Sequence, residues 1–221
     1  MGWKEKIENY QEQKREALDK EKEEENRRKE KLEKQVVKLG GIVKKLGLKE
    51  MLTQIRDEVW QVGDIGEIAE TPDFLVDGRR EIVKAGVELK ASWPKFCEGY
   101  DDEDMYDNSY WVDATTETII KRLAIVVSQN EDENDNFGIS IQTEQHSFQG
   151  TLLCDYDKFI LSTNEQNLNR EDSIKKIEET LIRDGLVSRG LSYLKEKEAA
   201  EKEIIEMIGQ GQLNPEYYPK K

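Results

Sequence analysis

The sequence predicts an α+β protein with a mixed, mainly antiparallel sheet and a packed helix, flanked by long N- and C-terminal helices. Three observations support this fold class. Residues 3–46 and 173–208 are rich in helix-forming residues, residues 48–62 form an amphipathic helical pattern, and the middle holds several short strand-like runs. The predicted domains are a charged helix (1–47), an α+β core (48–163), a helical segment (164–208) and a flexible tail (209–221).

The N-terminal stretch predicts one long helix, because it has no proline and no glycine between Trp3 and Leu39. Its apolar stripe is interrupted by "DKEKEEENRRKEK", which is polar all round. This middle part is either a solvated single helix held by Glu–Lys pairs or a weak coiled coil, and the polar composition favours the first. The glycines in "LGG", residues 39–41, allow a bend.

The core begins in this prediction with a helix at Leu48 that packs on the sheet through one apolar face. Strands are expected at "DFLVD", "EIVKAGVELKASW", "RLAIVVSQ", "FGISIQTE", "FQGTLLC" and "KFILST". The segment "WVDATTETIIKR" starts like a capped helix at Asp113. Asn169 or Asp172 can cap the last helical region, which should break at Gly185 or Gly190.

The net charge of −14 is unevenly distributed. Residues 101–163 carry most of the acidic excess, whereas residues 26–49 hold nine basic and two acidic side chains. The basic segment could contact the phosphates of DNA. The acidic and aromatic stretch "EGYDDEDMYDNSYW" could dock a basic peptide, imitate nucleic-acid phosphates, or form a solvated loop.

The sequence excludes several classes of site. No apolar run is long enough for a membrane span, and the N-terminus has no apolar signal region, so the expected location is the cytoplasm. Two cysteines, Cys97 and Cys154, and a single histidine, His146, cannot supply a conventional four-ligand zinc site.

The stretch "EIVKAGVELKAS" alternates apolar and polar residues, which places Glu88 and Lys90 on one face of a strand. Any half-solvated strand shows this alternation. A carboxylate and a lysine on one face, with Asp73 on the preceding strand, are also what metal-assisted phosphodiester cleavage requires.

Pro72-Asp73 followed by Glu88-Leu89-Lys90 resembles the PD-(D/E)xK nuclease superfamily, and "GVELK" resembles its MutH-like motif strand. The resemblance covers residues 48–129. It implies that Asp73 and Glu88 bind Mg²⁺ together with the Leu89 carbonyl, that Lys90 assists the nucleophile, and that Glu58 completes the site. In the MutH-like spacing the first metal ligand is instead Glu81.

Two classes of function follow as hypotheses. The first is a Mg²⁺-dependent DNA endonuclease of the restriction-endonuclease type, or a relative that has lost activity. The second is a non-enzymatic, acidic interaction or assembly protein that binds a basic protein through its helices and acidic face, or that acts as a DNA mimic. They differ in whether the carboxylates of Asp73 or Glu81 and of Glu88 converge with the Lys90 amine.

Overall fold

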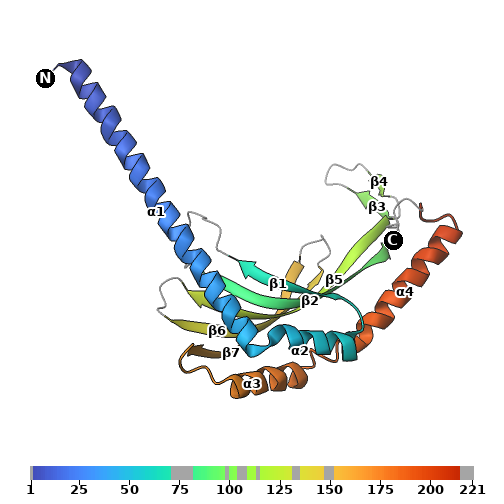
Figure 1. The fold of residues 1–221 in the computed structure, drawn as a ribbon. Coiled ribbons are helices and arrows are strands. Elements are labelled where there is room, and N and C mark those ends of the chain that lie inside the picture. Colours follow the sequence, from blue (N-terminus) through green and yellow to red (C-terminus); the bar gives the residue numbers. More distant parts are fainter. Residues whose placement is uncertain are drawn as a thin grey trace.

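The computed structural model describes residues 2–70, 82–97, 100–103, 109–112, 115–130, 135–146 and 152–214. It confirms the α+β class, with helices packed on an antiparallel sheet (Figure 1). The elements in chain order are α1 (Trp3–Leu46), α2 (Leu48–Ile55), η1 (Arg56–Trp60), β1 (Asp64–Glu70), β2 (Ile82–Cys97), β3 (Tyr100–Glu103), β4 (Ser109–Val112), β5 (Thr115–Asn130), β6 (Asn136–His146), β7 (Leu152–Asn164), α3 (Arg170–Arg183) and α4 (Gly190–Gly209).

The described strands form a five-stranded sheet in the order β1-β2-β5-β6-β7, and β3 pairs with β4 in a separate hairpin. Every described pairing is antiparallel. The pair β2–β5 is the longest and runs from Ile82 opposite Asn130 to Cys97 opposite Thr115. In this order β1 and β7 are the two edge strands of the sheet.

Helix α1 is a single 44-residue helix that continues through Gly40 and Gly41. It ends at Gly47, whose φ of 69° is the left-handed conformation that favours glycine at a helix end. Residues 10–31 are exposed along their whole length, and the helix projects away from the sheet in Figure 1. Burial begins at Leu32, so the core starts earlier in the chain than the predicted Leu48.

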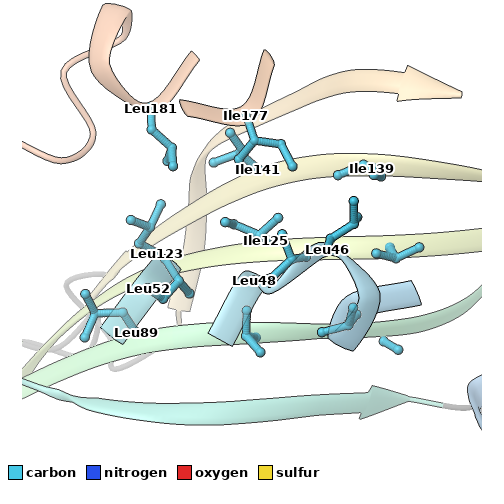
Figure 2. Packing of buried hydrophobic residues seen from close by; sticks show 14 of the residues in the cluster. Leu46, Leu48, Leu52, Leu89, Leu123, Ile125, Ile139, Ile141, Ile177 and Leu181 are labelled. Carbon is cyan, nitrogen blue, oxygen red and sulfur yellow. The ribbon is translucent and has the colours of Figure 1, made fainter. Parts of the chain in front are cut away.

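One face of the sheet carries the helices and the main core (Figure 2). Leu46 and the α2 residues Leu48 and Leu52 face the sheet, and Ile177 and Leu181 of α3 pack over the same face. The strand residues that meet them are Leu89, Leu123, Ile125, Ile139 and Ile141. The opposite face carries a small cluster of Ile68, Ala124 and Val126. The sheet therefore has one helix-covered face and one outer face.

The predicted helix at residues 113–122 is wrong where it is described, because β5 begins at Thr115 and continues to Asn130. The Thr-rich start resembles a helix cap, but Thr and Ile are also good strand formers. Pairing with β2 along sixteen residues supplies long-range hydrogen bonds that outweigh the local helical signal. The predicted strand "DFLVD", residues 73–77, lies outside the described residues.

Two predicted boundaries of the C-terminal helices, the start of α3 and the break between α3 and α4, are confirmed. The Asn169 side chain caps α3 by accepting hydrogen bonds from the backbone N–H groups of Glu171 and Asp172. The break between α3 and α4 includes Gly185, which has a φ of 68°. No helix in the described ranges combines the length and the apolar character that crossing a membrane requires.

Candidate functional site

Glu88 and Lys90 lie on β2 with their side chains on the outer face of the sheet. The neighbours Val87 and Leu89 are fully buried under the helices, whereas Glu88 is half-buried and Lys90 is exposed. The alternation therefore puts Glu88 and Lys90 on the same face, as the sequence predicts. Their neighbours in the register are Gly66 opposite Glu88, and Asp64 and Arg122 on either side of Lys90.

The Glu88 carboxylate is occupied by an arginine on the adjacent strand. Arg122 on β5 donates from Nε to Glu88 Oε2, and its Nη1 lies 2.6 Å from Oε1 of Glu144 on β6. The three side chains are only 16–24% exposed. We call this row across β2, β5 and β6 the Glu–Arg–Glu ladder.

The two carboxylates of the ladder favour the protonated, charged form of Arg122. Although burial alone would lower the pKa of Arg122, the hydrogen bonds and charges of Glu144 and Glu88 raise it overall. Gly66 also leaves space for the ladder, because a Cβ at that position would lie 3.0 Å from Glu88 Oε1. The ladder thus uses Glu88 as a structural ion-pair partner.

Glu58, the other described residue of the predicted site, does not join Glu88. It is exposed on η1, where the next buried residue, Trp60, packs into the core on the helix-covered face. Glu88 points to the outer face. The sheet therefore separates the two carboxylates.

The remaining predicted ligands, Asp73 and Glu81, lie outside the described residues. Within the described ranges, no group of three or more His, Cys, Asp or Glu side chains converges as a metal site. Among the described members of the predicted set, Glu88 faces a guanidinium and Glu58 lies on the other side of the sheet.

The predicted phosphate-binding segment, residues 26–49, has two roles in the structure. Its apolar residues belong to the core, whereas most of its basic residues are exposed. Arg27, Lys31, Lys34 and Lys38 line a pocket on one side of α1. Acidic residues lie close to some of these cations: Glu23 is 2.7 Å from Arg27, and Asp135 is 2.7 Å from Lys38. These partners reduce the positive charge that α1 offers to phosphates.

The acidic stretch at residues 98–111 is described only in part. Tyr100–Glu103 and Ser109–Val112 form the β3–β4 hairpin. Residues 98–99 and 104–108 lie outside the described residues.

A second ionic cluster, which sequence reasoning missed, surrounds Asp184 at the end of α3. Its carboxylate accepts a hydrogen bond from the Tyr156 hydroxyl and lies 2.8 Å from Lys158 Nζ and 2.9 Å from Arg183 Nε. Hydrogen bonds from Arg183, Lys158 and Tyr156 hold the pKa of Asp184 well below its usual value. Burial, and then the Asp184 carboxylate, raise the pKa of Tyr156 to about 12. The cluster joins β7 to the end of α3.

This cluster predicts a loss of stability in acid. A carboxylate whose pKa is lowered by folding stabilises the native state above its unfolded pKa of about 3.9, and this contribution is lost as the pH falls through the folded value. We expect the melting temperature of Asp184→Asn to fall less than that of wild type between about pH 5 and about pH 2. Thermal melts followed by circular dichroism test this. The exposed Glu178→Gln on the same helix is the control and should follow wild type; parallel curves for all three proteins would contradict the prediction.

In comparisons with protein-family models, curated proteins and solved structures, nothing matches the chain.

Proposed function

We propose that the protein is a non-enzymatic interaction protein that binds a basic protein partner, with α1 as the arm that reaches it. The observation that carries this proposal is the exposure of every residue from 10 to 31 in a helix whose first buried residue, among those with described side chains, is Leu32. At 1.5 Å per residue this exposed part extends for about 33 Å.

The arm is stabilised by its own side chains. Ion pairs four residues apart join Glu23 to Arg27 and Glu25 to Lys29, at 2.7 and 2.8 Å. Such pairs support the helix through residues 19–31, which are polar and exposed. Tyr10 and Leu18 are 68% and 47% exposed, so the arm also offers apolar contacts to a partner.

The charge of the whole chain supports a basic protein as the partner. The net charge of −14 attracts positively charged surfaces and repels nucleic acid. The ladder supports a non-catalytic role for Glu88, because Arg122 pairs with Oε2 of its carboxylate on the half-buried outer face of the sheet. The endonuclease activity that the PD-(D/E)xK resemblance implies stays a prediction.

Removing the arm should leave the domain folded. Deletion of residues 3–28 takes away no described side chain that is buried, and keeps Leu32 and the rest of the core segment of α1. We expect the melting temperature to change by less than about 3 °C. By contrast, deletion of residues 3–46 removes Leu32, Leu39 and Leu46 from the core and should unfold the chain. A large loss of stability in the shorter deletion would show that the arm packs on the domain.

The function is tested by photo-crosslinking in cells that express the protein. A photoreactive amino acid at Tyr10 or Leu18 should give one discrete adduct, whereas the same group at the exposed Lys175 of α3 should not. The crosslinked protein is then purified, and its affinity for the full chain should exceed that for the 3–28 deletion at least about tenfold. Equal affinities would contradict the role of the arm. Mg²⁺- or Mn²⁺-dependent cutting of plasmid DNA that Lys90→Ala abolishes would overturn the proposal.

A further inference from the structure

A groove of about 700 Å³ lies between α1, the start of α2 and strands β1 and β2. Its lining is mainly apolar, with Val36, Val37 and Val43 of α1 on one side and Ala69 of β1 on the other, and it also contains the charged residues Lys44, Lys49, Glu50 and Glu67. Val37 is 76% exposed, which is unusual for an aliphatic residue next to the core segment of a helix. The groove is thus an uncovered apolar surface at the β1 edge of the sheet.

Gly40 and Gly41 line the same groove from the interior of α1. Glycine inside a helix lowers stability relative to alanine, so two in succession need a reason. Nothing in the described structure supplies one, because a Cβ at either position would meet no atom within 4 Å. Both residues have helical backbone, so no turn requires them. They leave the helix backbone open to close approach by another chain.

Strand β1 forms the floor of the groove at the edge of the sheet. It pairs with β2 on one side, and in the described part of the chain no strand pairs with its other side. An unpaired edge can accept a further strand through backbone hydrogen bonds. Because side chains alternate along a strand, every second residue of an added strand would lie on the helix side, over the groove.

The acidic residues of β1 favour an added strand that carries basic side chains. The sequence of β1 contains Asp64, Glu67 and Glu70 and no basic residue. Glu67 and Glu70 stay 64% and 57% exposed, although Lys49 lies 2.8 Å from Glu67 and Lys84 lies 3.9 Å from Glu70. Like charges would oppose pairing of β1 with β1 of a second copy, whereas a basic segment would be attracted.

We infer that this groove and the free edge of β1 form a docking site for an extended, basic segment of a partner protein, which joins the sheet as a sixth strand. This inference rests on the proposed function and locates one contact that such a partner makes. The apolar side chains of the segment cover Val37 and Ala69 on the helix side, and its basic side chains lie on the outer face of the sheet, beside Asp64 and Glu70 of β1. Gly40 and Gly41 let the segment approach α1.

The test uses a short peptide of alternating valine and lysine and the isotope-labelled full chain in nuclear magnetic resonance titrations. We expect shifts of the amide signals of residues 64–70 and 36–44, and slower hydrogen exchange at the free edge of β1. The same peptide with N-methyl groups on alternate residues should bind at least about tenfold more weakly, because one edge of its backbone can no longer pair. A valine and glutamate peptide should not bind.

Two substitutions separate the groove from other surfaces. Gly41→Leu should weaken binding of the valine and lysine peptide at least about tenfold by filling the groove, whereas Ala17→Leu, on the exposed arm, should leave it unchanged. Gly41→Ala should raise the melting temperature and weaken binding, a combination that a purely structural glycine would not give. Binding that survives N-methylation and Gly41→Leu, with shifts mapped elsewhere, overturns the groove but leaves the proposed function standing. No binding of this peptide to any part of the chain also overturns the groove, whereas the proposed function is tested separately by the crosslinking at Tyr10 and Leu18.

Discussion

Gly190→Ala is expected to lower the free energy of unfolding by about 3 kcal/mol, because an added methyl group would overlap the indole ring of Trp60. Gly190 is the first residue of α4 and is buried directly against that ring. Trp60 also meets Tyr193 of α4 edge to face, with ring centroids 4.9 Å apart. The helix can lie this close to η1 only without a side chain at Gly190.

The measurement is urea or thermal unfolding of the full chain, where about 3 kcal/mol corresponds to a fall of about 6–12 °C in melting temperature. A double-mutant cycle identifies the cause. Trp60→Phe should destabilise the wild-type background by leaving a cavity, but should cost much less or even restore stability in the Gly190→Ala background. Gly209→Ala, at the other end of α4 in open space, is the matched control and should have little effect. Additive effects of the two substitutions would contradict the collision.

Arg122→Met is expected to lower the free energy of unfolding by about 2–3 kcal/mol, because it leaves the two half-buried carboxylates of Glu88 and Glu144 without the cation that pairs with both. The residual exposure of the ladder keeps the expected cost below that of a fully buried pair. Adding Glu88→Gln and Glu144→Gln to this variant should recover much of the loss, since neutral amides remove the repulsion.

Chemical denaturation at neutral pH measures these changes. Arg27→Met, which breaks the exposed pair with Glu23, serves as the control and should change the free energy of unfolding by no more than about 0.5 kcal/mol. If Arg122→Met is as mild as the control, the ladder is not a stabilising element. Glu88 would then again be open to the metal-binding role that the PD-(D/E)xK pattern implies.

The sequence predicts well those elements that are marked by a local pattern, such as alternating apolar and polar residues or a helix-capping residue. The alternation from Val83 to Ala91 identifies β2, and the Asn169 cap identifies the start of α3. The helix predicted from Thr115 to Arg122 is wrong because these residues pair with β2, which is distant in the sequence, despite a helix-like start. Local patterns do not contain that pairing.

The candidate site was less predictable for the same reason. Glu88 and Lys90 lie on one face as their spacing implies, but the partner of Glu88 depends on the register of β5 against β2. A signal was present in the sequence, because Arg122 is the basic residue that directly precedes the buried run Leu123–Val127. An arginine at the border of a core strand requires a carboxylate nearby. Which carboxylate it meets follows only from the sheet.

The anchoring of α1 from Leu32 onwards fixes the direction as well as the length of its free part. A straight helix turns by about 100° and advances by about 1.5 Å for each residue. The directions in which the Tyr10 and Leu18 side chains point around the helix axis are therefore fixed relative to the sheet. Deletion of about seven residues between Leu18 and Leu32 removes about two helical turns, so a bound partner would lie about 10 Å closer to the domain in almost the same orientation. Deletion of about five residues would instead rotate the partner to another side of the domain.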